Sequence, residues 1–411
     1  MKKAAEQVYR KDLKPFEGKT KVPLALTDKI QLTLLTGYYP KDSADLKKAQ
    51  AKKVALLFSD FVRQARQSIH IAIYDFRLED PEAGIVIDAL NDISKSGVDV
   101  KVAYFQPSKK RELVSDFSRY GGDPAPEPDR SFLERLRKNV QFKAIVEIGV
   151  EQLPSDVTPL PIEAGGQLMH SKYIIRDGLS PSAAVWTGSA NFTTDAWSIQ
   201  DNNIVTLESQ DLAGNYETDF AELWATGRIA GTGKNDFGET NIDCIATDVD
   251  FAPGDGPAMD LSIAGHISKA DSEILLSSMV ISSGTVLGAL VDAMERGVKI
   301  TGVYDGPQMD QVIKDFEKST HGTGQAKILQ WNTIKGNLVP KHSTPYSPNG
   351  THDFMHNKAL VVDQRVVATG SYNFSMNATR NAENMITMYD QAIASQYKEY
   401  IKSLISRYGS S

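Results

Sequence analysis

The segment MHNKALVVD, residues 355–363, is followed six residues later by GSYNF, residues 370–374. The same pattern occurs earlier in the chain, where MHSKYIIRD spans residues 169–177 and GSANF spans residues 188–192. In both copies His and Lys are two positions apart, an Asp follows five positions after the Lys, and a Gly-Ser-x-Asn-Phe element comes next. So much shared detail is not expected by chance, so the chain contains an internal repeat.

The repeat extends upstream of these motifs. Residues 68–76 are rich in β-branched and aromatic residues and predict a strand, and the apolar residues 273–281 predict its counterpart. Each segment is followed by a helical apolar pattern, a Gly-Val pair (residues 97–98 and 297–298) and a second apolar strand. This order predicts a βαβ unit in each half, at one offset of 200 residues.

The side chains of the motifs suit phosphate chemistry. His and Lys at positions i and i+2 of a strand project from the same face. The Lys can stabilise phosphate oxygens while the imidazole attacks or donates a proton. The Ser hydroxyl and Asn amide that follow can hold further phosphate oxygens. One HxK alone could be a chance surface pair, but two matched copies favour a phosphodiester site.

The two motifs resemble the signature of the phospholipase D superfamily, HxKxxxxDxxxxxxGSxxN or GSxN, and the resemblance covers residues from about 32 to 407. It implies a duplicated α/β fold, in which two mixed-sheet halves flanked by helices meet at a pseudo-twofold interface and share one active site. It also implies that neither a metal nor another cofactor is needed. One histidine would form a covalent phosphohistidine, and the other would protonate the leaving alcohol and later activate water.

The resemblance assigns the site residues position by position. The catalytic residues are His170, His356, Lys172, Lys358 and Glu383. The phosphate ligands are the two lysines together with Ser189, Asn191, Ser371 and Asn373. We take His170 as the nucleophile and His356 as the acid. Asp177 and Asp363 are expected to have structural roles at the ends of the strands.

The two copies differ in two places. Ten residues rather than six separate Asp177 from Gly188, and a longer turn can absorb this difference. Residues 381–384 read NAEN where residues 200–203 read QDNN, so Asn202 stands opposite Glu383. In the family an acidic residue here orients a catalytic histidine. Glu383 can do so, whereas Asn202 can orient a histidine without adding charge, so the two histidines should differ in pKa. A partly degenerate first site is the alternative.

The predicted domain organisation follows the repeat. We expect an N-terminal extension at residues 1–31, a first half at 32–228, a connector rich in Gly and polar residues at 229–241, and a second half at 242–411. Because both motifs lie in one chain, dimerisation is not needed to complete the site, and no oligomeric state is inferred.

Composition limits the class of protein. The chain is 41% hydrophobic and 24% charged, has no apolar run long enough to span a bilayer, and begins without the apolar stretch of a secretory signal. Its single cysteine, Cys244, excludes an internal disulfide. We therefore expect a soluble cytoplasmic protein, although a mature secreted form would look the same. The net charge of −7 argues against coating nucleic acid by bulk charge but not against a local basic cleft.

The second motif most resembles the small bacterial endonucleases of the superfamily and their cardiolipin-hydrolase relatives. We therefore expect a nuclease that cleaves DNA or RNA, with a phospholipase D or phosphatidyl transferase as one alternative and an inactive phosphate-binding module as another. Two basic clusters favour nucleic acid, although the second could be a solvated helix: Lys109-Lys110-Arg111, and Arg130, Arg135, Arg137, Lys138 and Lys143. Three aromatic residues could stack on bases, touch acyl chains or simply pack: Trp331, Tyr346 and Phe354.

Overall fold

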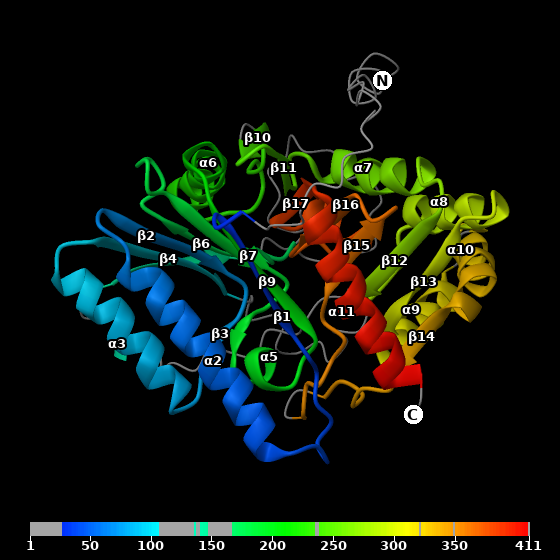
Figure 1. The fold of residues 1–411 in the computed structure, drawn as a ribbon, viewed down its shortest axis with the longest axis horizontal. Coiled ribbons are helices and arrows are strands. Elements are labelled where there is room, and N and C mark those ends of the chain that lie inside the picture. The colour runs from blue at the N-terminus through cyan, green and yellow to red at the C-terminus, as the bar shows by residue number, and fades with distance from the viewer. Residues whose placement is uncertain are drawn as a thin grey trace.

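The computed structural model describes residues 27–106, 135–136, 140–146, 167–234, 238–319, 322–347 and 350–409. Two large mixed sheets stand at the centre, one from each half of the chain, with helices on their outer faces (Figure 1). This arrangement confirms the predicted α/β class with two mixed sheets flanked by helices. Most of the predicted N-terminal extension, residues 1–26, lies outside the described residues.

The first sheet has the strand order β1-β9-β7-β6-β2-β4-β5. Strands β2, β4 and β5 run parallel, and the other neighbouring pairs are antiparallel. The bounds are β1 Ile30–Leu35, β2 Ser68–Ile73, β4 Asp99–Gln106, β5 Gln141–Val146, β6 Lys172–Arg176, β7 Ala184–Gly188 and β9 Asn202–Glu208. The short strands β3 (Phe76–Arg77) and β8 (Phe192–Thr193) pair separately.

The second sheet repeats this pattern as β11-β17-β16-β15-β12-β13-β14, with the same directions, and adds β10 at its edge. The bounds are β10 Gly238–Ile242, β11 Ile245–Ala252, β12 Glu273–Ser278, β13 Lys299–Asp305, β14 Leu338–Lys341, β15 Lys358–Val362, β16 Val366–Gly370 and β17 Glu383–Tyr389. Because β10 starts at Gly238, part of the predicted connector is a strand of this sheet.

The helices form the outer layers and the interface. Helices α2 and α3 cover the outer face of the first sheet, α7 to α10 flank the second, and α6 and α11 lie on the inner sides (Figure 1). The bounds are α2 Ala44–Arg63, α3 Glu82–Lys95, α5 Thr194–Ser198, α6 Gln210–Thr226, α7 Gly256–Ser268, α8 Gly284–Glu295, α9 Gly306–Lys318, α10 Gly322–Ile334, η4 Lys335–Asn337, η5 Ala378–Arg380 and α11 Gln391–Gly409. Within the described ranges, no helix combines the length and apolar character required to cross a bilayer.

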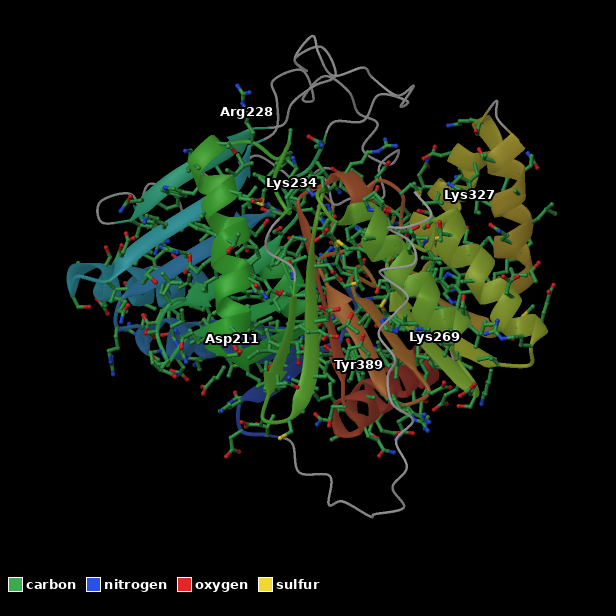
Figure 2. All side chains as sticks on the ribbon, turned by 90° about the horizontal axis from the view of Figure 1, so that it is seen from above. Asp211, Arg228, Lys234, Lys269, Lys327 and Tyr389 are labelled. Atoms are coloured by element: carbon green, nitrogen blue, oxygen red, sulfur yellow. The ribbon has the colours of Figure 1, made fainter. Side chains whose placement is uncertain are left out.

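An apolar cluster with residues from both halves lies between the two sheets. It contains Tyr173 and Tyr216 of the first half together with Phe251 of the second, with ring centroids 5.0 and 4.9 Å apart along this series. Seen from above, Asp211 of α6 and Lys269 after α7 lie on opposite sides, with Tyr389 of β17 between them (Figure 2). Since burial of apolar surface is the main stabilising term in folding, this core ties the halves together.

Polar contacts across the interface follow the same symmetry. Thr369 Oγ1 of β16 donates to Asn203 Oδ1 of β9 at 3.0 Å. In the mirrored contact, Asn384 Nδ2 of β17 donates to Thr187 Oγ1 of β7 at 2.7 Å. The Thr position of each copy therefore contacts the Asn position of the other copy, as a pseudo-twofold axis requires.

Candidate active site

Both HxK motifs lie at the start of a central, buried strand. Lys172 is the first residue of β6 and Lys358 is the first residue of β15, and all five residues of each strand are buried. The side chains of His170 and His356 are 0% exposed, and those of the two lysines are 1% exposed. The repeat thus places two imidazoles and two ammonium groups in the interior, where charge interactions are strong.

Each histidine is oriented by a residue from the other half. His170 Nδ1 lies 2.8 Å from Glu383 Oε2, and His356 Nδ1 lies 2.9 Å from Asn202 Oδ1. Because carboxylate and amide oxygens only accept hydrogen bonds, both rings carry a hydrogen on Nδ1. This tautomer leaves Nε2 as the atom that can react.

Backbone hydrogen bonds also hold each histidine against the half that supplies its orienting residue. His170 N donates to Ala382 O at 2.8 Å, and His356 N donates to Asp201 O at 3.0 Å. Met169 pairs with Ala382, and Met355 pairs with Asp201, in isolated parallel bridges. Each HxK segment is therefore held against the segment that carries its orienting residue.

The electrostatic surroundings of His170 involve both halves. Burial lowers the pKa of its imidazole below the usual value, Glu383 opposes this shift, and Lys172 and Lys358 lower the pKa further. The ring is therefore uncharged at neutral pH. Its Nε2 has no hydrogen-bond partner among the described residues. An uncharged imidazole with Nε2 unengaged is the form that can act as a nucleophile.

The two lysines differ in their contacts. Lys358 Nζ lies 3.1 Å from His356 Nε2 and donates to His356 O at 2.8 Å. Lys172 Nζ donates to His170 O at 2.6 Å and lies 5.0 Å from the centre of the Tyr74 ring. Both ammonium groups thus stay beside the histidine of their own motif, where they can attract a bound phosphate group.

The serine hydroxyls support the orienting residues. Ser371 Oγ donates to Glu383 Oε2 at 2.7 Å, and Ser189 Oγ donates to Asn202 Oδ1 at 2.8 Å. Each Oγ also accepts a hydrogen bond of 2.9 Å from the N–H of the residue that follows the orienting side chain. A hydroxyl has one hydrogen, and here it is directed at the orienting side chain rather than at a ligand. Direct phosphate binding by Ser189 and Ser371 stays a prediction.

Close packing of neighbouring strands requires glycine at the first position of each GSxN element. Gly188 and Gly370 have φ angles of 144° and 147°. A Cβ at Gly188 would lie 2.2 Å from Asn203 O, and one at Gly370 would lie 2.2 Å from Asn384 O. Only glycine allows this close approach of neighbouring strands, which positions the serine that follows. Asn191 and Asn373 are both 3% exposed, and their phosphate-binding role also stays a prediction.

The aspartates of the motifs lie at the other end of their strands. Asp177 accepts hydrogen bonds of 2.7–3.0 Å from the backbone N–H groups of residues 66–68, and Asp363 accepts bonds of 2.8–3.0 Å from those of residues 271–273. Both residues have positive φ angles, 52° and 48°. They link the end of the motif strand to the start of β2 or β12, in agreement with the expected structural role.

One site residue could not be recognised from the motifs. The Tyr74 ring lies 4.8 Å from the His170 ring, edge to face, and is 2% exposed. Tyr74 N donates to Ser171 O, as Met279 N donates to Asn357 O in the other copy. Aligning the ends of β2 and β12 with each other would have indicated this position, but the different residue types hid it.

The features that favoured nucleic acid gain no support from the described residues. Trp331 and Phe354 are 4% and 1% exposed, and Tyr346 contacts His352, so packing accounts for these three aromatics. Lys143 contacts the carbonyl of Trp224. Arg135 lies 3.4 Å from Asp80. The other residues of the two basic clusters lie outside the described residues: Lys109, Lys110, Arg111, Arg130, Arg137 and Lys138. In the described ranges, no group of three or more His, Cys, Asp or Glu side chains is arranged to hold a metal ion.

Comparisons with known proteins find relatives in sequence and in fold. A family model described as "Cardiolipin synthase, PLD-like domain" matches residues 58–224 and 263–405. "Phospholipase D" of Rickettsia conorii is 33% identical over 136 residues, 33% of this chain and 58% of that protein. "Phospholipase D" of Rickettsia bellii is 31% identical over 148 residues, 36% of this chain and 64% of that protein. The match thus spans less than two thirds of these relatives' length.

Two solved structures share the fold at low sequence identity. Phosphatidylserine synthase of Haemophilus influenzae Rd KW20 has a TM-score of 0.57 and 12% identity, over 91% of this chain and 86% of that chain. Polyphosphate kinase of Porphyromonas gingivalis has a TM-score of 0.53 and 14% identity, over 91% of this chain and 50% of that chain. Both cover the two halves together, so the paired arrangement occurs in other proteins.

Proposed function

The chain belongs to the phospholipase D superfamily, and from this premise we propose that it is a phosphodiesterase with His170 as nucleophile and His356 as general acid and base. The observation that carries the proposal is the crossed pairing of the histidines. Glu383, on Nδ1 of His170, increases the electron density at Nε2, as a nucleophile requires. Asn202 orients His356 without a charge, which suits a group that must both release and accept a proton.

The proposed reaction has two displacements. The first displacement starts with His356 as the imidazolium, which carries a hydrogen on Nε2 as well as on Nδ1. His170 Nε2 attacks phosphorus, the bond from phosphorus to the leaving oxygen breaks, and that oxygen takes the Nε2 proton of His356, which becomes uncharged. Water then loses a proton to His356 and attacks phosphorus, and the electron pair of the breaking P–N bond returns to His170. Lys172 and Lys358 stabilise the negative oxygens during both steps. Every proton and electron pair is thereby accounted for within the site.

A phospholipid is the substrate class that we propose first. Five curated relatives named phospholipase D, 30–33% identical over their matched parts, support it, as does the cardiolipin synthase description of the family model. Nucleic acid, which the sequence favoured, is the second candidate. The similarity of residues 356–384 to the endonuclease motif supports it. The described basic and aromatic residues add nothing to that second candidate.

The test is a panel of phosphodiesters assayed with excess EDTA. Phosphatidylcholine, phosphatidylglycerol and cardiolipin vesicles are compared with single- and double-stranded DNA and RNA, using wild type, His170→Ala and His356→Ala. We expect headgroup release that persists in EDTA and is lost in both variants. Nucleic-acid cleavage with the same dependence would replace lipid with the second candidate. Turnover that survives both substitutions, or that requires a divalent metal, would overturn the mechanism, and binding without turnover would identify an inactive module.

A further inference from the structure

A buried ion pair connects the halves beside the site. Lys341 Nζ, from the end of β14, donates to Asp201 Oδ2 at 2.8 Å, and both side chains are 0% exposed. Asp201 directly precedes β9, so the pair joins the second half to the first. Removing two charges from water costs several kcal/mol per ion unless both are well paired. A pair this deeply buried therefore requires a close-fitting set of partners.

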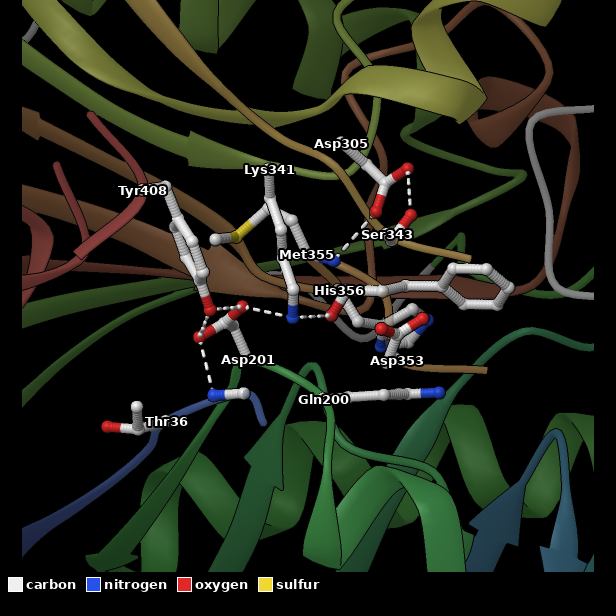
Figure 3. A network of polar contacts seen from close by, with 12 residues as sticks. Thr36, Gln200, Asp201, Asp305, Lys341, Ser343, Asp353, Met355, His356 and Tyr408 are labelled. Atoms are coloured by element: carbon white, nitrogen blue, oxygen red, sulfur yellow. Dashed lines mark hydrogen bonds and ion pairs between the residues drawn. The ribbon is translucent and has the colours of Figure 1, made fainter. Parts of the chain in front are cut away.

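Those partners come from both ends of the described chain. Gly37 N donates to Asp201 Oδ1 at 2.6 Å, and Tyr408 OH of α11 lies 3.0 and 2.8 Å from the two carboxylate oxygens (Figure 3). A Cβ at Gly37 would lie 2.3 Å from Lys341 Nζ and 2.6 Å from Asp201 Oδ2, so any larger residue there would displace the ion pair. The Asp201 carboxylate thus accepts hydrogen bonds from three donors: Lys341 Nζ, Gly37 N and Tyr408 OH.

The ion pair reaches His356 through two consecutive backbone residues. Asp201 N donates to Phe354 O at 3.1 Å, and Lys341 Nζ lies 3.3 Å from the same oxygen. Asp201 O accepts from His356 N at 3.0 Å. The next residue, Asn202, meets the His356 ring at 2.9 Å. The pair therefore fixes the backbone before His356 and the backbone that carries its orienting residue.

Asp305 holds the residue in between. Its Oδ2 accepts from Met355 N at 2.8 Å, and its Oδ1 accepts from Ser343 Oγ at 2.8 Å (Figure 3). Asp305 is itself 0% exposed and ends β13. Residues 354, 355 and 356 are therefore each held by a polar contact to the network, and none depends on a solvent-exposed group.

The other copy has a different arrangement at the equivalent positions. Ala382 takes the place of Asp201, and its carbonyl accepts from His170 N. The carboxylate of that copy is one residue later, in Glu383, and touches the His170 ring directly. In the first copy, the carboxylate belongs to Asp201, one residue before the position equivalent to Glu383. It therefore lies away from the histidine ring and binds Lys341.

We propose that Asp201 and Lys341 are positioning residues for His356, which hold residues 354–356 against Asn202 so that the amide meets the ring. Only the expected change in kcat rests on the catalytic role proposed above for His356; the expected change in ring position does not. The ion pair supplies rigidity, and its own charges cancel, so the ring is oriented by a neutral group only. The side chains of the pair bind each other, the Tyr408 hydroxyl and backbone groups rather than a histidine ring, so the pair positions His356 and is not catalytic itself.

Three variants test the proposal: Asp201→Asn, Lys341→Met and the double variant. Loss of one charge leaves the other buried and can prevent folding, whereas the double variant removes both. Glu217→Gln is the control, because it removes one carboxylate charge from a part-buried contact of 2.7 Å with His70, elsewhere in the first half. Histidine ring signals are followed by ¹⁵N NMR, with His356→Gln and His170→Gln to assign them, and turnover is measured on bis(4-nitrophenyl) phosphate.

In each folded variant of the pair we expect the His356 ring signals to move while those of His170 stay in place. We expect kcat to fall by roughly 10²-fold and KM to change by less than about threefold, because misplacement impairs chemistry more than binding. The control should match wild type in both measurements. A folded double variant with unchanged His356 signals and unchanged kcat would overturn the proposal. If wild type cleaves no phosphodiester, the proposed function fails, and the ring signals alone still decide whether the pair positions His356.

Discussion

His170 and Glu383 belong to opposite copies of the repeat, and their side chains meet at 2.8 Å although neither is exposed. The equivalent contact of His356 is made with the uncharged amide of Asn202 at 2.9 Å. The two histidines therefore share a geometry and differ in charge. Two substitutions exchange these charges: Glu383→Gln and Asn202→Asp.

Replacing Glu383 by Gln should weaken His170 as a nucleophile. Burial lowers the pKa of His170 and Glu383 counteracts this effect, so loss of the carboxylate should lower the pKa further. We expect kcat to fall by roughly 10²–10⁴-fold and the acidic limb of the profile of kcat/KM against pH to move to lower pH. An acidic limb at its wild-type position would mean that another group titrates there.

Replacing Asn202 by Asp should give His356 the partner that His170 has. The substitution keeps the size of the side chain, and Ser189 can donate to the new carboxylate as Ser371 does to Glu383. A negative charge on Nδ1 raises the pKa of an imidazole. The basic limb of the pH profile should therefore move to higher pH. If it does not move, His356 is not the acid.

Replacing Asp177 by Ala should destabilise the fold without touching the site. Three backbone N–H groups at residues 66–68 would lose their acceptor, and Ala tolerates the φ angle of 52° poorly. We expect the free energy of unfolding, from urea titration, to fall by about 3 kcal/mol. Asp177→Asn keeps an acceptor and tolerates this φ, so it should lose less than half as much. Equal losses would show that the hydrogen bonds are not the cause.

Asp305 should make stability depend on pH. Burial raises the pKa of its carboxyl to about 7, although Met355 N, Ser343 and Lys341 lower it. Between about pH 4 and pH 7 the folded chain therefore binds a proton that the unfolded chain releases, and the free energy of unfolding falls as pH rises. Asp305→Asn has no such titrating group. From pH 4 to pH 8 the free energy of unfolding of the variant should therefore rise, relative to that of wild type, by on the order of 4 kcal/mol. Urea titrations at several pH values, with Glu217→Gln as control, measure the difference. Parallel curves would contradict it.

The local part of the fold could be predicted from the sequence. Strand periodicity and the matched segments at residues 68–104 and 273–304 indicate two βαβ units, and the α/β class with two mixed sheets is confirmed. The period of two in a strand also places His and Lys of each motif together. Those inferences need only neighbouring residues, which is why a single sequence suffices for them.

The relations between the halves could not be predicted. Asn202 and Glu383 were recognised as orienting candidates, but nothing within one copy indicates that each serves the histidine of the other. Lys341 lies in an irregular stretch, 140 residues from Asp201, and carries no motif. The roles of the two serine hydroxyls depend on where their single hydrogen points. Such contacts are set by how two sheets dock, and sequence spacing does not contain that information.

The different partners of the two histidines assign different roles to the two sides of the proposed site. A phosphodiester has two ester oxygens, and a symmetric pair of halves could expel either one. In the proposed mechanism, the carboxylate on Nδ1 of His170 assigns the attack to that side, and the amide on Nδ1 of His356 assigns protonation to the other. Of two different groups on one phosphorus, the proposed roles then expel the group that faces His356, while the other group stays bound to His170 through phosphorus. Under the proposed roles, the orientation in which a diester binds between the two histidines therefore decides which of its two bonds is cut.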